Sequence, residues 1–463
     1  MLTSERVAAR SLVTASPPAR LGSPPRVVAS NPSPAKLRQL LLGPTLEHAA
    51  TRVPYYRKRW GARPKQLRLT RLPFLTKDEA IAHQEELLAG ERFAYVGAVS
   101  SGTMHGDQRP LRVLRTEVEK KALDDFLAMH ERPPRARRHP GWVLEVRAMH
   151  HGIPLGPPFA DRLRMPWTYT ANALRLLEEM LSRPQADGRW VTSLVIGAGA
   201  LMPFTAHLLE RGVDPSRWKV RTIGTTGFRL SPHWRRLVAE VFDAAVLDNY
   251  SLSEFESPAL ECQRCGYNHW LPPPLYFEVV DAHTRQALER GTGVLVLTGL
   301  FPFAQAMPLV RYWTGDLVEL GPRCAEGQDI GIRFRGRLSE SLVLDGRVLV
   351  ASQDVVDFLE GRPEVARHPH PMETLGLIRS PEAGAVKFEA RLNEARRVIA
   401  HITVELRFDP KVFSSEAEAV GRGLARYLLS KSPILRRLER RKEGELQVHL
   451  TGPGGVTQRW SKF

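Results

Sequence analysis

The chain has 463 residues, 43% of them hydrophobic and 25% charged, so it can bury a large core and is long enough for two or three domains. Its apolar runs end after a few residues, far short of the roughly 20 that cross a bilayer, and we expect no membrane span. The formal net charge of +16 favours polyanionic partners such as nucleotides, nucleic acid or acidic proteins. The basic runs 132–138 and 436–442 lack interleaved aromatic residues, which disfavours nucleic acid.

The N-terminal segment differs from the rest in its charge. Its first 46 residues carry a single acidic side chain, Glu5, and are rich in Arg, Ser, Ala and Pro. Because such a segment lacks hydrophobic periodicity, we predict a disordered tail over residues 1–35. A transit peptide has a similar composition, but here the Arg, Ala and Pro content continues along the chain. No charged-then-apolar signal sequence is found, so we expect a cytoplasmic protein.

Helical and strand patterns alternate in the middle of the chain. Helical spacing of apolar residues at 35–56 and a polar helical pattern at 76–89 precede this region. Three further helices are predicted at 171–181, 203–211 and 232–242. Short apolar runs predict strands at 191–196, 220–223 and 245–248. This alternation predicts an α/β layered domain with parallel strands.

After residue 250 the pattern changes to strands separated by turns, at 275–281, 293–298, 309–313 and 332–335, which predicts a β-rich subdomain. Beyond Gly336, strands at 386–392, 401–408 and 446–450 accompany a helix at 416–430. We therefore predict an α/β fold with two domains. Residues 36–335 form a large N-terminal domain with layered sheets and a β-rich subdomain, and residues 336–463 form a small, mobile α+β C-terminal domain.

All three cysteines of the chain fit one metal-binding pattern. Cys262, Cys265 and His269 are spaced as C-x-x-C-x-x-x-H, and Cys324 lies in the later loop GPRCAEG. Three thiolates and one imidazole are the donors of a closed tetrahedral zinc site. We predict that these four residues bind a structural zinc ion and tie two distant loops together. A redox-active cysteine pair or simply buried cysteines are the alternatives.

Four motifs in chain order carry the functional signal. The first is AVSSGTMHGDQRP at 98–110, which follows an expected strand and whose hydroxyls and backbone N–H groups can hold phosphate oxygens. It is followed by DNYSLSE at 248–254, RYWTGD at 311–316 and RGRLSESLVLDG at 335–346. In this order the motifs resemble the adenylate-forming superfamily. The ECxxC…H stretch, MPLVRYWTGDL and SQDVV resemble its phenylacetate–coenzyme A ligase branch in particular.

The resemblance implies a binding site for ATP. It implies that adenine stacks on Tyr250, that Asp316 accepts hydrogen bonds from the ribose hydroxyls, and that Thr226 and Gly227 lie near the adenine. The β- and γ-phosphates are implied to contact a set of loop residues, Ser100, Ser101, Gly102 and Thr103.

The resemblance also implies catalytic residues. Glu254 is implied to hold Mg²⁺, a cation that prefers oxygen ligands. Arg337 is implied to hold the ribose and phosphate end of the nucleotide. Lys462 near the C-terminus is implied to contact the α-phosphate and the substrate carboxylate. Each residue also has a purely structural alternative, as a core aromatic, a solvated carboxylate or a surface cation.

The chain departs from the family pattern at several positions. Met104 and His105 interrupt the phosphate loop. The sequence Thr226–Gly227–Phe228 lacks the carboxylate usual at that place, and Ser251 replaces the usual glycine. The hinge aspartate of the family corresponds to Ser339, so we place the hinge segment at residues 336–341.

The predicted function is that of an ATP-dependent carboxylic acid ligase, which forms an acyl-adenylate and transfers the acyl group to a thiol with release of AMP. Coenzyme A is the default acceptor. The alternatives are an acid–amine ligase, a ligase that loads an acidic carrier protein, a degenerate nucleotide-binding homologue, and an interaction protein that uses its basic surface and zinc. We also keep open a homodimer. Trp167, Tyr169 and Phe204 are candidates for an apolar acyl pocket.

Overall fold

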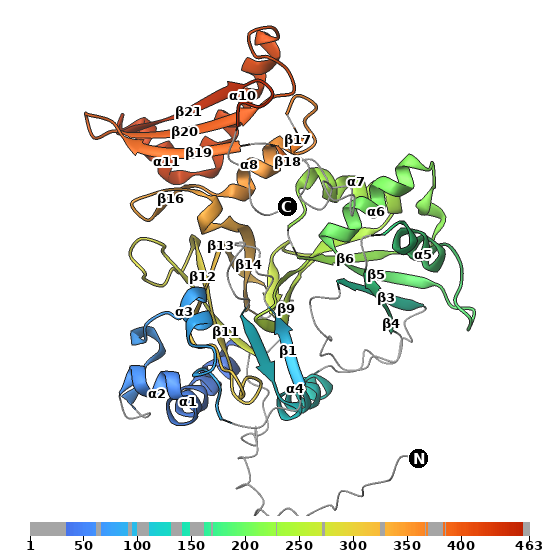
Figure 1. Cartoon of the computed structure of the whole chain (residues 1–463), viewed down its shortest axis with the longest axis vertical. Helices are drawn as coiled ribbons and strands as arrows, with labels where there is room; N and C mark the ends of the chain where they lie inside the picture. The colour runs from blue at the N-terminus through green and yellow to red at the C-terminus, as the bar shows by residue number, and fades with distance from the viewer. Residues whose placement is uncertain are drawn as a thin grey trace, which may run out of the picture. The chain divides into compact units, whose positions relative to one another are not determined.

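The structure is a computed structural model that describes a defined set of residues (Figure 1). These are residues 34–61, 66–90, 95–99, 111–130, 141–148, 162–167, 170–227, 229–270, 274–324, 329–365, 367–368, 383–384 and 386–456. The predicted tail at 1–35 lies outside them, except for its last two residues, which begin a helix. Within the described residues, no helix combines the length and the apolar character needed to span a membrane.

A five-stranded parallel sheet forms the α/β part of the molecule. Its strand order is β4 (Arg162–Trp167), β3 (Trp142–Ala148), β5 (Val191–Gly197), β6 (Thr222–Thr226) and β7 (Ala245–Asp248). All four strand pairings are parallel, as the sequence predicts. The connecting helices are α5 (Ala171–Ser182), α6 (Ala198–Glu210) and α7 (Pro232–Phe242), and α6 and α7 pack against strands of this sheet.

Local sequence signals set the ends of these helices. In α7 the hydroxyl of Ser231 accepts a hydrogen bond from the Trp234 N–H, and Pro232 occupies the first turn, where its missing N–H is not needed. Thr170 caps α5 in the same way. The buried residues of α5, Ala173, Leu177 and Leu181, recur every four positions and form its apolar face.

A seven-stranded antiparallel sheet carries most of the motifs. Its order is β11 (Leu275–Val280), β12 (Gly291–Gly299), β13 (Tyr312–Cys324), β14 (Asp329–Arg337), β10 (Asn268–Trp270), β9 (Phe255–Glu261) and β8 (Tyr250–Leu252). The N-terminal elements are α1 (Pro34–Arg52), α2 (Pro54–Trp60), α3 (Lys77–Ala82), the hairpin β1 (Tyr95–Val99) and β2 (Arg112–Arg115), and α4 (Glu117–His130). Many buried residues of α1 to α3 join one hydrophobic cluster with this sheet.

The C-terminal part has its own sheet and core. A short hairpin, β15 (Leu342–Leu344) and β16 (Arg347–Val350), leads into α8 (Ser352–Leu359) and a two-stranded pair, β17 (Arg367–His368) and β18 (Ala383–Gly384). The three-stranded sheet β19 (Val386–Leu392), β20 (Val398–Glu405) and β21 (Gly444–Thr451) packs with α10 (Ser414–Lys431) and α11 (Pro433–Arg440). Its buried cluster runs from Leu342 to Leu435.

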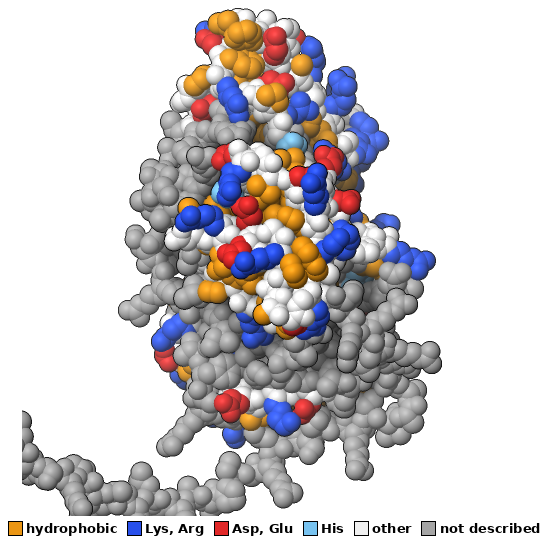
Figure 2. Space-filling model, turned by 90° about the vertical axis from the view of Figure 1, so that its right-hand side faces the viewer, with side chains coloured by type: hydrophobic (Ala, Val, Ile, Leu, Met, Phe, Trp, Pro, Cys, Tyr) orange, Lys and Arg blue, Asp and Glu red, His pale blue; other side chains and the backbone are white. Residues whose placement is uncertain are grey.

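The predicted fold class is confirmed, since the layered α/β part, the β-rich sheet and the small α+β part are all present. The division at residue 336 stays a prediction. On the face that Figure 2 shows, basic side chains are interspersed with acidic ones across its described part. On this face the positive charge is therefore not gathered into a single patch.

Phe204, a candidate for an apolar acyl pocket, lies in the hydrophobic core. Its side chain is fully buried in the core of the parallel sheet, with ring centroids 6.4 Å from Trp218 and 6.2 Å from Phe242. Trp167 belongs to the same core cluster, and Tyr169 lies outside the described residues. The apolar character of Phe204 and Trp167 therefore reflects core packing.

We expect Phe204→Ala to lower the free energy of unfolding by about 3–5 kcal/mol, because the truncated side chain leaves a cavity in a close-packed core. Leu209→Ala in the same helix is the control, since Leu209 is 49% exposed and its loss should change stability by less than about 0.5 kcal/mol. Urea unfolding followed by tryptophan fluorescence measures both. Equal losses for the two variants would contradict this assignment of Phe204 to the core.

Candidate active site

One cavity of about 480 Å³ brings together motif residues that are far apart in the sequence. We call it the site cavity. Four of the predicted site residues line it, namely Gly227, Tyr250, Asp316 and Arg337. They come from the turn after β6, from β8, from β13 and from β14, so the site cavity lies where the two large sheets and the hinge segment meet.

Asp316 is a buried carboxylate at the centre of this arrangement, with 1% of its surface exposed. Tyr250 Oη donates a hydrogen bond to its Oδ2 atom over 2.7 Å, and Arg337 Nε lies 3.4 Å from its Oδ1 atom. The register of β13 and β14 places Asp316 directly opposite Arg337. Among the described residues, Oδ1 accepts no hydrogen bond. Because buried carboxylate oxygens are normally hydrogen-bonded, this atom has capacity for a hydroxyl donor from a ligand.

Tyr250 is fixed by contacts on several sides. Its ring is nearly parallel to that of Phe334, with centroids 6.1 Å apart, and it meets Trp270 edge-on. Burial, reinforced by the negative charge of Asp316, raises the pKa of Tyr250 well above its ordinary value. The phenol therefore stays protonated and donates to Asp316, while the ring contributes an aromatic surface to the site cavity.

The loop after β6 is attached to the Tyr250 strand. The hydroxyls of Thr226 and Ser251 lie 2.7 Å apart. Gly227 follows with a φ of +103°, a conformation that side-chain-bearing residues rarely adopt. Serine in place of the usual glycine at position 251 thus supplies a hydrogen bond that fixes the end of β6 against β8. Gly227 lines the site cavity, and its place near the adenine stays a prediction.

Among the described residues that line the site cavity, Glu254 is not included. It is 6% exposed, and Tyr312 Oη donates to its Oε1 atom over 3.0 Å. Lys77 Nζ lies 3.7 Å from the same oxygen. A buried carboxylate that already attracts one cation is a suitable donor for a divalent metal ion, but the Mg²⁺ role of Glu254 stays a prediction.

Several predicted site residues fall outside the described part of the chain. These are Ser100, Ser101, Gly102, Thr103 and Lys462. Their phosphate-binding and catalytic roles therefore stay predictions. The strand expected before this stretch is present as β1 (Tyr95–Val99), which extends into the first two residues of the stretch.

One wall of the site cavity is polar and charged. Asp248 accepts a hydrogen bond from the Leu230 N–H, and Asn268 Nδ2 donates to its carbonyl oxygen. Burial raises the pKa of Asp248 to about 7, with Arg229 opposing this shift. Arg235 is held by Glu261 over 2.7 Å. This wall therefore offers hydrogen-bonding groups to a ligand.

The cysteine cluster, which we define as Cys262, Cys265, Cys324 and His269, is assembled from the turn after β9, from β10 and from the end of β13. The three sulfur atoms lie within 4.8 Å of one another, and Cys262 Sγ is 3.7 Å from Cys324 Sγ. His269 Nε2 is 3.2 Å from Cys265 Sγ. Burial lowers the pKa of His269, which favours the neutral imidazole that a metal ligand requires. Three sulfurs and an imidazole fit a zinc ion.

Sequence reasoning missed the partners that hold the site. Tyr312 is part of the RYWTGD motif, yet its bond to Glu254 depends on β13 lying near the turn after β8. Lys77 comes from the N-terminal part of the chain. Arg229 lines the site cavity, and no sequence pattern singles it out. Their positions become visible only when the elements are packed.

Comparison with known proteins identifies relatives by sequence. No protein-family model matches the chain. The phenylacetate-coenzyme A ligase of Thermus thermophilus is 29% identical over 346 residues, which is 68% of this chain and 73% of that enzyme. The enzyme of the same name from Aromatoleum evansii is 28% identical over 221 residues, which is 44% of this chain and 48% of that enzyme.

Solved structures agree in fold. 2-Hydroxyisobutyryl-CoA ligase, in an open conformation with 2-HIB-AMP and CoA, superposes with a TM-score of 0.63 and 15% identity over 95% of each chain. The same enzyme in its postadenylation state gives a TM-score of 0.60, over 93% of this chain and 88% of that chain. The chain is therefore similar in sequence to phenylacetate–coenzyme A ligases, and it shares its fold with 2-hydroxyisobutyryl-CoA ligase.

Proposed function

We propose that the protein is an ATP-dependent carboxylic acid ligase, which forms an acyl-adenylate and then transfers the acyl group to a thiol. One observation carries this proposal. Tyr250, Asp316 and Arg337, from three separate motifs, converge on a single cavity of about 480 Å³. An aromatic face, a buried carboxylate and a guanidinium in one cavity match the base, the ribose and the phosphates of a nucleotide.

The residues fit the nucleotide on chemical grounds. Oδ1 of Asp316 has capacity for hydroxyl donors, and an ionised carboxylate accepts such bonds strongly, which suits the ribose. The Tyr250 ring offers an aromatic face for adenine. Arg337 supplies positive charge at the hinge segment, where the phosphates would begin.

In the proposed first step, a carboxylate oxygen of the substrate bonds to the α-phosphorus of ATP, and the bond to the bridging oxygen breaks to release pyrophosphate. Charge on the phosphates has to be neutralised, so the loop hydroxyls at Ser100, Ser101 and Thr103 and the ammonium of Lys462 would stabilise the transition state. Mg²⁺, when held by Glu254, supplies further positive charge.

In the proposed second step, a thiolate sulfur bonds to the acyl carbonyl carbon and AMP leaves with its electron pair. Coenzyme A is the default thiol, since the sequence relatives are named as coenzyme A ligases and the structural neighbour binds CoA. That neighbour has been captured in postadenylation and thioesterification states. In this chain, a rotation about the hinge segment between the two steps would produce one conformation for adenylate formation and another for thioester formation.

The decisive experiment is acid-dependent exchange of pyrophosphate into ATP, measured with purified protein and a panel of carboxylic acids. Exchange that requires an acid supports adenylate formation. Mass spectrometry of the products with coenzyme A or amines present then distinguishes a thioester from an amide. ATP binding without exchange for any acid would contradict the proposal and favour a nucleotide-binding homologue.

We expect Asp316→Asn to weaken ATP binding by about 10- to 100-fold, because a neutral amide cannot replace a carboxylate that accepts charge-assisted hydrogen bonds. Isothermal titration with ATP measures the change. Asp214→Asn is the control, since that carboxylate is 57% exposed and does not line the site cavity. Unchanged affinity in Asp316→Asn, with an unaltered melting temperature, would contradict the ribose assignment.

We also propose that the cysteine cluster holds one structural zinc ion, since four protein donors leave no position open for water. Protein purified without chelator should contain about one zinc per chain by elemental analysis. Cys265→Ser should lose most of this metal and melt at a lower temperature. His83→Ala, at a histidine outside the cluster, should retain the metal. Metal-free wild-type protein would refute the site.

A further inference from the structure

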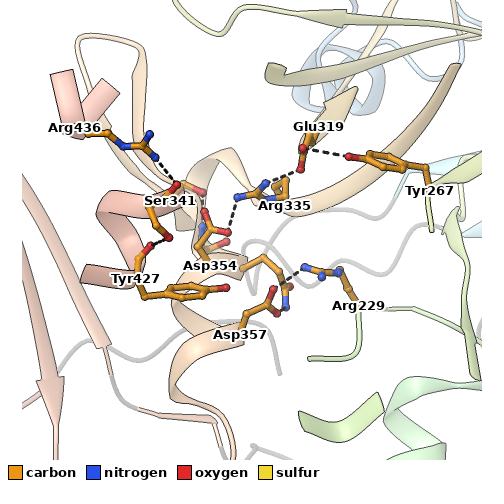
Figure 3. A network of polar contacts seen from close by, with 12 residues as sticks. Arg229, Tyr267, Glu319, Arg335, Ser341, Asp354, Asp357, Tyr427 and Arg436 are labelled. Carbon is orange, nitrogen blue, oxygen red and sulfur yellow. Dashed lines mark hydrogen bonds and ion pairs between the residues drawn. The ribbon is translucent and has the colours of Figure 1, made fainter. Parts of the chain in front are cut away.

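Helix α8 is attached to the large sheet by an arginine bridge. Arg335 on β14 binds Glu319 on β13 over 2.7 Å and Asp354 on α8 over 2.5 Å (Figure 3). The side chains of Arg335 and Asp354 are only 13% and 7% exposed. Water therefore screens this contact far less than it would a surface pair.

A second ion pair attaches the same helix elsewhere. Arg229 Nη1 binds Asp357 Oδ2 over 3.0 Å, with exposures of 21% and 7% (Figure 3). Arg229 lies two residues after Gly227, in the segment that leaves β6. Asp354 and Asp357 are three positions apart and so project from neighbouring turns of α8. We call these two ion pairs the α8 clamp.

The clamp holds α8 where it contributes a wall of the site cavity. Ser352, Gln353 and Val356 line that cavity. Gly336 in the hinge segment has a φ of +115°, and a Cβ atom placed on it would lie 2.0 Å from Ser352 Oγ. The start of α8 thus packs against the hinge segment so closely that only glycine fits.

The two ends of each ion pair belong to opposite sides of the hinge segment. Arg335 and Arg229 precede residue 336, whereas Asp354 and Asp357 follow residue 341. A rotation about this segment would therefore separate both pairs. Unpaired buried charges are costly, so such a rotation needs each charge to retain another partner.

Each member of the clamp has such a partner on its own side. Arg335 keeps Glu319, whose other oxygen accepts a hydrogen bond from Tyr267 Oη over 3.3 Å. Asp357 keeps Gln353, whose Nε2 donates to it over 2.9 Å. Asp354 interacts electrostatically with Lys431, and Arg229 with Asp248. When the clamp opens, Arg335 and Asp357 therefore each keep a hydrogen-bonded partner, and Asp354 and Arg229 each keep an electrostatic interaction with a group of opposite charge.

We propose that Arg335 and Arg229 are positioning residues, whose ion pairs to α8 set the balance between adenylate formation and acyl transfer. This inference rests on the proposed function for its kinetic part. When the clamp is closed, α8 completes the site cavity. When it opens, the small C-terminal part is free to take its place for the other half-reaction.

The test uses the full-length double variant Asp354→Asn, Asp357→Asn, which keeps the shape of both side chains and removes their charge. Hydrogen exchange of the α8 amides, measured without any substrate, should speed up by about tenfold or more, since local opening becomes easier. The ratio of overall thioester formation to pyrophosphate exchange should change by about fivefold or more, because the two half-reactions respond unequally. Arg335→Lys, which retains the charge, should shift both readouts less than Arg335→Ala.

The control is Glu178→Gln, which breaks an ion pair of similar length, 3.0 Å to Arg211, within the α/β part. It should leave both readouts unchanged. Unaltered α8 exchange in the double variant, or an equal fall of both half-reactions, would overturn the inference. If the wild type activates no acid, the proposed function fails, and the exchange measurement still decides whether the clamp positions α8.

Discussion

The carboxylate of Asp316 is the group on which the rest of the site depends. A buried negative charge has to be compensated, and the sheet provides the compensation from two strands at once. Arg337 lies opposite on β14, and Tyr250, 66 residues away in sequence, reaches in from β8. The pairing register of the strands therefore brings the three motifs together. It places the Tyr250 ring and the Arg337 guanidinium at defined positions around the Asp316 carboxylate.

The same sheet links the candidate metal site to the hinge segment. Tyr267 lies between Cys265 and His269 in sequence, and its hydroxyl donates to Glu319, which in turn holds Arg335. Arg333, on the same strand as Arg335 and Arg337, donates to the Gly266 carbonyl oxygen and lies over the Tyr267 ring at 4.1 Å. Alternate residues of β14 thus contact the segment between Cys265 and His269, the clamp and Asp316 in turn.

Sequence reasoning predicts this protein well where the signal is local. The bounds of α7 and β7 follow from the Ser231 cap, from Pro232 and from the short apolar run after Asp243. The motifs identify Tyr250, Asp316 and Arg337, and the C-x-x-C spacing identifies the cysteines. Sequence reasoning fails where the packing of distant segments determines the position of a residue. Phe204 lies in the core, and α6 begins at Ala198 although Pro203 suggests a later start. Contacts between residues distant in sequence bring Lys77, Tyr312 and the two clamp arginines to the site.

The central claim is that one nucleotide is held in the site cavity with its ribose at Asp316. A crystal structure with a non-hydrolysable ATP analogue tests this most directly. We predict density for the nucleoside against the Tyr250 ring, with a ribose hydroxyl within hydrogen-bond distance of Asp316 Oδ1. A nucleotide bound elsewhere, or an Asp316 carboxylate that contacts only Tyr250 and Arg337 in the complex, would contradict the account.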